Sequence, residues 1–245
     1  MRTLKGNVGF NGHSNKMKYL VVGTGRSGTG YISELCKGKG LAFGHEMTFN
    51  ESKLKTKGSA DAYIPHIHGC DGDSNWLSVP FLNIYKKANV KIFNVVRDPF
   101  KVVKSLIGIG MPGDGVQLNF FNRHIWKFLP GLKAYQKCSR LDLAVYYLVN
   151  WNQMIKDFMG DDYKFYRIEE DLGLLMKDMG LPPEIPTKSQ LSTTWNTRPG
   201  TRYPVPDFNL KSINTLLHRD LRQPFLDYVE EHKYYNIKYN GDVNL

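Results

Sequence analysis

The segment Tyr19–Cys36 limits the fold of this chain more than any other stretch. It begins with a short apolar run, Tyr-Leu-Val-Val, whose length and β-branched content are typical of a buried strand. A glycine-rich turn, Gly23–Gly30, follows, and apolar residues at helical spacing begin again at Tyr31. In this order of strand, glycine turn and helix, backbone N–H groups and the positive end of the helix can bind a phosphate or similar anion. The segment therefore predicts an anion-binding loop inside an α/β fold.

Strands and helices are expected to alternate along the rest of the chain. Residues 1–17 are polar and form a lead-in, and residues 18–245 are expected to form one domain. Its mostly parallel central sheet should be covered by helices on both faces. Polar or glycine-rich stretches predict irregular structure at 50–75, a lid or acceptor loop at 108–135, and a loop at 181–210. The expected strands are 41–43, 90–96 and 163–168, and the expected helices are 75–87, 99–107, 141–159, 172–177, 212–217 and 221–232, with residues 169–171 capping the helix that ends at 177.

Composition narrows the partners and the setting. The chain has 33 Lys and Arg against 23 Asp and Glu, a net charge of +10, which favours anionic partners. The basic residues are scattered rather than clustered, so no nucleic acid is expected. Three widely spaced cysteines form neither a zinc pattern nor a disulfide framework, which favours a reducing compartment. No signal peptide and no apolar run of ~18 residues is visible, so we expect a soluble, cytoplasmic protein without a membrane span.

The glycine turn does not fit an ordinary nucleoside triphosphatase. Gly23 and Gly28 have the spacing of a Walker A loop, but Thr29 stands in the position of its lysine. Gly30 stands in the position of the hydroxyl residue that binds magnesium. The turn therefore lacks both the phosphate cation and the metal anchor of that class.

The same turn satisfies a dinucleotide pattern. Gly23, Gly25 and Gly28 match G-x-G-x-x-G, and Glu46 follows Gly28 by 18 positions, near the place of the ribose-binding acid. An NAD(P)-dependent oxidoreductase is therefore an alternative. Arg26 and its neighbouring serine inside the turn suit an anion better than the close approach of an uncharged group.

A second set of residues lies after the strand expected at 90–96. Arg97 follows that strand directly, Asp98 and Pro99 form a helix start, and Ser105 lies eight positions after the arginine. The arginine and the hydroxyl two helical turns later can bind one further phosphate. Two anion sites at the ends of neighbouring parallel strands suit a nucleotide with phosphates at both ends.

With both motifs in view, the chain resembles the PAPS-dependent sulfotransferases. The family's 5′-phosphosulfate loop is similar to G-T-G-R-S-G-T-G here, with Arg26 in place of the lysine of many cytosolic members. The family's 3′-phosphate motif matches Arg97, Pro99 and Ser105. The segments 151–155 and 165–172 are also similar to a helix and a strand-to-helix segment of the family. The resemblance runs in the same order from residue 19 to residue 172.

The resemblance implies a fold of the P-loop-containing, sulfotransferase type, with PAPS as sulfuryl donor, PAP as product and no metal. The acceptor would be a hydroxyl or amine of a small molecule or carbohydrate. The segment 197–203 resembles the basic C-terminal loop that closes over the nucleotide in the family. The expected nucleotide-binding residues are Gly25, Arg26, Ser27, Gly28, Thr29, Gly30, Arg97, Ser105, Arg198 and Arg202.

In-line sulfuryl transfer needs donors at the leaving phosphate and a base at the acceptor. Arg26 and the loop donors would stabilise the leaving group. Carbohydrate-type members carry a catalytic glutamate in the region of Glu46, which follows His45 at the end of the second expected strand. Cytosolic members use a histidine ahead of the arginine strand, which corresponds to His66 or His68. The base therefore stays open between Glu46, His45 and His68.

Overall fold

The computed structural model describes residues 16–47, 69–113, 120–185 and 203–234. Five strands form one sheet in the order β2-β3-β1-β4-β5, and every neighbouring pair runs parallel. The prediction of an α/β fold around a parallel sheet is therefore confirmed. The strands are β1 (Tyr19–Val22), β2 (Phe43–His45), β3 (Gly72–Ser74), β4 (Lys91–Val96) and β5 (Phe165–Arg167).

The helices of the described residues follow the strands and fill the connections between them. The α-helices are α1 (Thr29–Gly38), α3 (Leu82–Lys87), α4 (Pro99–Ile109), α5 (Phe120–Phe128), α6 (Arg140–Met159), α7 (Leu172–Asp178), α8 (Ile213–Leu216) and α9 (Arg219–Glu231). Short 3-10 helices are η2 (Trp76–Phe81), η3 (Pro130–Tyr135), η4 (Gly160–Asp162) and η5 (Leu210–Ser212).

Strand β1 is buried on both of its faces. Leu20 and Val22 belong to the core that η2, α3 and α6 cover, whereas Val21 belongs to the core under α1 and α7. Because alternate side chains of a strand point to opposite faces, a strand covered on both sides must be apolar throughout. This is why β1 appears in the sequence as a continuous apolar run.

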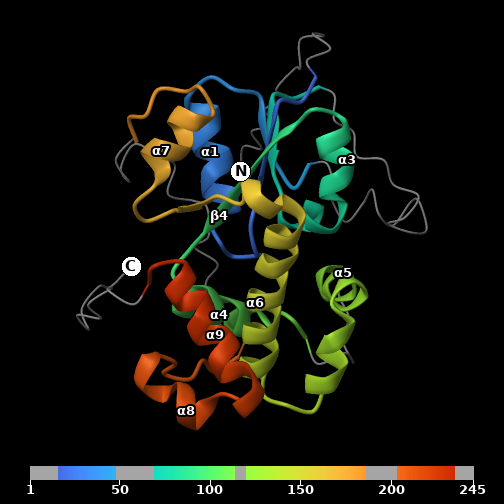
Figure 1. Cartoon of the computed structure of the whole chain (residues 1–245), viewed down its shortest axis with the longest axis vertical. Coiled ribbons are helices and arrows are strands. Elements are labelled where there is room, and N and C mark those ends of the chain that lie inside the picture. The colour runs from blue at the N-terminus through green and yellow to red at the C-terminus, as the bar shows by residue number, and fades with distance from the viewer. Residues whose placement is uncertain (1–15, 48–68, 114–119, 186–202, 235–245) are drawn as a thin grey trace, which may run out of the picture.

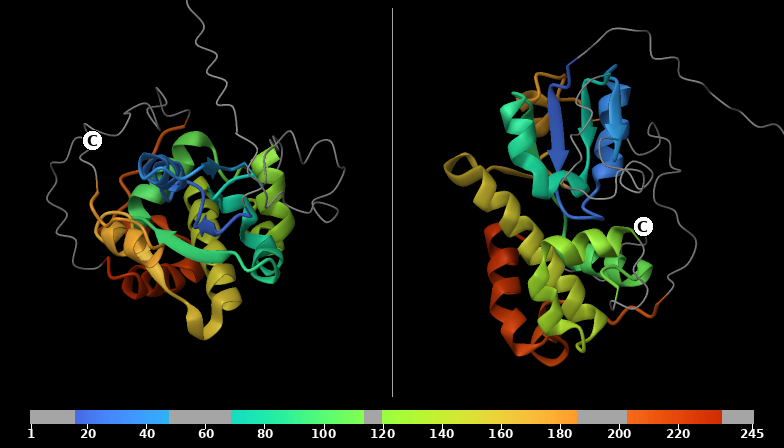
Figure 2. Two further views of the ribbon diagram at one scale, coloured as in Figure 1. Left: turned by 90° about the horizontal axis from the view of Figure 1, so that it is seen from above. Right: turned by 90° about the vertical axis from the view of Figure 1, so that its right-hand side faces the viewer.

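A layer of helices lies beyond the carboxyl ends of the strands. Figures 1 and 2 show α4, α5, α8 and α9 gathered at that end of the sheet, while α6 runs from this layer up along the sheet. Hydrogen bonds join the loop after β1 to a side chain of α6, and the residue after β2 to a side chain of η2.

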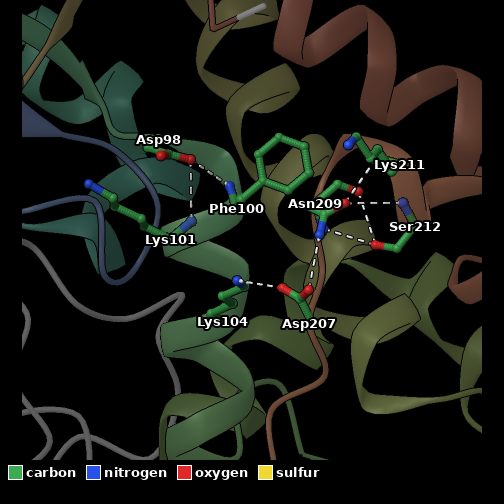
Figure 3. A network of polar contacts seen from close by, with 8 residues as sticks. All are labelled: Asp98, Phe100, Lys101, Lys104, Asp207, Asn209, Lys211 and Ser212. Atoms are coloured by element: carbon green, nitrogen blue, oxygen red, sulfur yellow. Dashed lines mark hydrogen bonds and ion pairs between the residues drawn. The ribbon is translucent and has the colours of Figure 1, made fainter. Parts of the chain in front are cut away.

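Helix α4 begins where the sequence predicts. Pro99 is its first residue, and the Asp98 carboxylate accepts hydrogen bonds from two backbone amides of the first turn. Figure 3 shows this cap beside a second contact, in which Lys104 Nζ lies 3.5 Å from Asp207 Oδ1. Asn209 caps η5, the turn that follows, and the buried ring of Phe208 packs against Phe100 of α4.

Residues 50–68 of the stretch expected to be irregular at 50–75 lie outside the described part, and strand β3 corrects the expectation for the rest. Gly-Asp-Ser has neither the β-branched nor the aromatic residues of a typical strand, yet Asp73 is fully buried between β2 and β1. The glycine is needed because a Cβ on Gly72 would lie 2.3 Å from a ring carbon of Phe43. The strand expected at 41–43 is likewise displaced, to Phe43–His45.

One expected helix and one expected loop were wrong in detail. The helix expected at 75–87 is divided: Asn75 caps the turn η2, which contains Pro80, and α3 starts only at Leu82. Proline lacks the N–H that a continuous α-helix would use, which accounts for the break. The expected lid or acceptor loop at 108–135 contains α5 and η3, and its residues 114–119 lie outside the described part.

The acidic cap expected before α7 was also wrong. Asp171 occupies the capping position, but its side chain makes no capping hydrogen bond. Its carboxylate instead accepts from the backbone N–H and the Nε–H of Arg167, at 2.9 and 3.2 Å. The charged arginine at the end of β5 therefore takes the carboxylate that the helix start would have used.

Candidate functional site

The glycine turn passes tightly over the sheet between β1 and α1. A Cβ on Gly23 would lie 2.4 Å from the carbonyl oxygen of Val95 in β4, so only glycine fits at that position. Arg26 and Gly28 both have left-handed backbone conformations, with φ of 74° and 94°. The chain reverses direction in this way before α1 begins at Thr29.

The partial positive charge at the start of α1 is not neutralised by a nearby acidic side chain of the first turn. Among the described residues no side chain caps this turn, and it contains no acidic residue. Both donors of Ser27 close the turn, because its N–H and Oγ–H each donate to the Thr24 carbonyl, at 3.1 and 2.6 Å. The hydroxyl predicted to bind a nucleotide therefore holds the loop in shape, while the amides of the helix start provide the electropositive end.

The two predicted anion motifs touch each other. Arg26 Nε–H donates to Ser105 Oγ at 2.8 Å, across 79 positions of the sequence. Arg97 Nη1 donates to the carbonyl oxygen of Arg26 at 3.4 Å, across 71 positions. These contacts are possible because β1 and β4 are paired and end at the same edge of the sheet. Two guanidinium groups and the start of a helix thus lie together.

Two of the three candidate bases lie beside this loop. His45 Nε2 is 3.3 Å from Thr29 Oγ1 and 3.7 Å from Glu46 Oε1. Glu46 Oε1 also accepts a 2.8 Å hydrogen bond from the indole N–H of Trp76. Glu46 has a left-handed backbone, with φ of 56°, which is costly for a residue with a side chain. The carboxyl end of β2 therefore brings an imidazole and a carboxylate to the glycine loop.

Helix α6 contributes a residue that the sequence analysis missed. The hydroxyl of Tyr147, which is fully buried, accepts a 2.8 Å hydrogen bond from the N–H of Gly25. Burial raises the pKa of the Tyr147 phenol, and the nearby charge of Glu46 raises it further. Tyr147 lies one helical turn before Trp151 on the same face of α6, and this spacing is the signal that could have indicated it.

Trp76 joins this site to the helical layer. Its ring centroid lies between 5.8 and 6.2 Å from those of four other rings, and only 4% of the residue is exposed. Trp76 is therefore a packed residue of the core. The four rings belong to Phe121, His124, Tyr147 and Trp151.

The remaining site predictions fall outside what the structure describes. His68, Arg198 and Arg202 all lie outside the described residues. Within the described ranges, no three His, Cys, Asp or Glu side chains gather as a metal site. No helix in the same part of the chain is long and apolar enough to cross a membrane.

No model of a known protein family matches the chain, and the search of curated proteins finds no match either. Any statement about activity therefore depends on the sequence motifs and on the geometry of the loop.

Proposed function

We propose that this chain is a PAPS-dependent sulfotransferase, which moves a sulfuryl group to a hydroxyl or amine of a small-molecule or carbohydrate acceptor. The observation that carries the proposal is the direct contact between the two anion motifs, from Arg26 to Ser105 and from Arg97 to the Arg26 carbonyl. PAPS has a phosphosulfate at its 5′ end and a phosphate at its 3′ position. One bound nucleotide could therefore reach both motifs.

The strand order supports a ligand at this place. In open parallel sheets, ligands bind outside the carboxyl ends of the strands where the order of the connections reverses. Here the chain leaves β1 toward β2 on one side, and β4 with β5 lies on the other side. The glycine loop and Arg97 follow β1 and β4, the two neighbouring strands at which the connections diverge.

The same order weighs against the oxidoreductase alternative. In the dinucleotide-binding fold the second strand lies next to the first and ends in the ribose-binding acid. In this sheet β3 separates β2 from β1. Glu46 therefore follows a strand that is not paired with β1, unlike the ribose-binding acid of that fold, and its carboxylate accepts a hydrogen bond from Trp76.

The proposed roles follow from charge and position. Arg97 and Ser105 would hold the 3′-phosphate, while Arg26 and the amides at the start of α1 would hold the 5′ side. As the acceptor oxygen or nitrogen attacks sulfur, the bond from sulfur to the bridging phosphate oxygen breaks, and negative charge grows on PAP. Arg26 and the Thr29 hydroxyl would stabilise that charge.

A base must take the proton of the acceptor in this reaction. Glu46 is the proposed base because its carboxylate lies beside the loop, within 3.7 Å of the His45 imidazole. His45 is the second candidate because it contacts Thr29 directly.

Nucleotide-induced thermal stabilisation tests the proposal. PAP at about 100 times its dissociation constant should raise the melting temperature by roughly 5–10 °C without magnesium. NAD and Mg-ATP should have little effect. Arg97→Ala should abolish the shift, whereas Arg219→Ala, a change at an exposed arginine on α9, should retain it. Stabilisation by NAD alone would overturn the proposal.

The role of Glu46 as base can be tested separately from the binding of PAP. Glu46→Gln should bind PAP like the unaltered chain and lose transfer from radiolabelled PAPS to an acceptor found by screening. Loss of PAP binding in this variant would contradict the role as base and would favour a residue that contacts ribose.

A further inference from the structure

We infer that Trp76 is a positioning residue for Glu46, fixing the carboxylate that acts as base; this rests on the proposed function. The indole Nε1–H donates to Glu46 Oε1 at 2.8 Å, from the turn after β3 to the residue after β2. The Glu46 side chain is 23% exposed, so it borders solvent, whereas Trp76 is buried. A rigid buried donor thus holds an acid that is reachable from outside.

The indole itself cannot easily move. Rings from α5 and α6 surround it, and Trp151 Nε1 also donates to the Trp76 carbonyl at 3.3 Å. The indole ring has one hydrogen-bond donor, its N–H, which needs an acceptor when it is buried. Here the acceptor is Glu46. The direction of that N–H is therefore set by the core, and the core determines where the carboxylate lies.

The backbone of Glu46 is held in a costly conformation at the same point. Its N–H donates to the Ser74 carbonyl at 3.1 Å, and the next amide, of Met47, donates to Asp73 Oδ1 at 3.3 Å. A left-handed conformation at a non-glycine residue persists only where the surroundings enforce it, and such residues concentrate at functional sites. Strand β3 thus fixes the Glu46 backbone while the turn after it fixes the side chain.

Titratable groups from three elements lie close to Glu46. His45 comes from β2, with its Nε2 at 3.7 Å, and Tyr147 comes from α6, where its phenol feels the charge of Glu46. Asp73 comes from β3 and accepts a hydrogen bond from the amide of Met47, the residue after Glu46. These groups stay unchanged when only the indole N–H is removed, so the effect of that hydrogen bond can be measured by itself.

Trp76→Phe removes the donor and keeps an aromatic ring. Trp151→Phe is the matched control, since it is the same change in the same cluster but removes an N–H that is bonded to a carbonyl. A hydrogen bond to a carboxylate favours its charged form, so Trp76→Phe should raise the pKa of Glu46 by about one unit. The acid limb of the pH profile of kcat/KM should move up equally, and kcat at neutral pH should fall by roughly tenfold or more.

Two readouts separate this inference from the proposed function. Carbon-13 NMR titration of the Glu46 carboxyl, assigned with Glu46→Gln, requires no activity, and PAP binding should change less than about twofold in both tryptophan variants. The inference is wrong if the carboxyl titration in Trp76→Phe is not shifted. It is also wrong if both variants lose kcat equally and the acid limb does not move, because Trp76 would then only pack in the core. If the unaltered protein bound no PAP but Trp76→Phe still shifted the Glu46 titration, the hydrogen bond would still control the carboxylate. The proposed function, and with it the role of Glu46 as base, would then be overturned.

Discussion

At the scale of single residues, Gly23 makes the sharpest stability prediction. The carbonyl of Val95 and the Ser27 hydroxyl, at 2.4 and 2.5 Å from the position of an added Cβ, cannot both withdraw. Gly23→Ala should therefore lower the free energy of unfolding by about 1–3 kcal/mol, measured by urea denaturation. Gly38→Ala is the control, because nothing lies within 4 Å of its Cβ position at the end of α1. That variant should be unchanged or up to about 1 kcal/mol more stable, and equal losses in both variants would contradict the steric explanation.

Some residues of the site have a local sequence pattern and others do not. Arg97, Pro99 and Ser105 stand within nine positions of each other, and a strand end followed by a capped helix gives them a recognisable spacing. The contacts of Trp76 with Glu46 and of Tyr147 with Gly25 span 30 and 122 positions. The spacing of Tyr147 from Trp151 indicates a buried face of α6, but no local pattern indicates which residue each side chain contacts, because the order of strands and the packing of α6 bring these pairs together.

At the scale of elements, the start of α6 links two parts of the helical layer. Ser139 and Asp142 form a reciprocal capping box, and Asp142 Oδ1 also accepts a 2.7 Å hydrogen bond from the N–H of His218. Ser139→Ala removes one side of the cap and should lower the free energy of unfolding by about 1 kcal/mol. Asp142→Ala also leaves the His218 amide without its acceptor and should cost about 1–3 kcal/mol more.

Urea denaturation of both variants checks this order. The double variant should be about as stable as Asp142→Ala alone, because the two side chains share one cap and their effects are not additive. If Ser139→Ala were the more damaging change, the contact of Asp142 with the chain before α9 would contribute nothing to stability.

Elements differed in how well they could be predicted. Strand β1 and helix α6 have strong apolar patterns, and both were found within one residue of their bounds. Strand β3 was missed because Gly72–Ser74 has no strand pattern of its own and is held by hydrogen bonds to its neighbours. Tertiary context also makes α5 a helix in a stretch whose glycines and aromatic residues indicated a loop.

At the scale of the whole molecule, acid should weaken the fold through buried histidines. Burial lowers the pKa of His124 to about 4, and it also lowers the pKa of His232. The unfolded chain binds these protons near pH 6.5, so below that pH it holds more protons than the folded chain. The stability contributed by neutral His124 is therefore complete above about pH 6.5 and is lost between there and about pH 4.

Urea denaturation between pH 7 and pH 4.5 measures this loss of unfolding free energy. For His124 the loss approaches about 3 kcal/mol once the pH falls to the folded pKa of about 4. His124→Gln keeps a donor near the Leu77 carbonyl, which the imidazole contacts at 3.0 Å, and removes the titration. It should be less stable than the unaltered chain at pH 7, because the ring contacts are lost, yet its stability should fall less steeply toward pH 4.5. His218→Gln, at an exposed position, should keep the original slope. Parallel curves for all three proteins would show that burial of His124 does not govern the acid sensitivity of the fold.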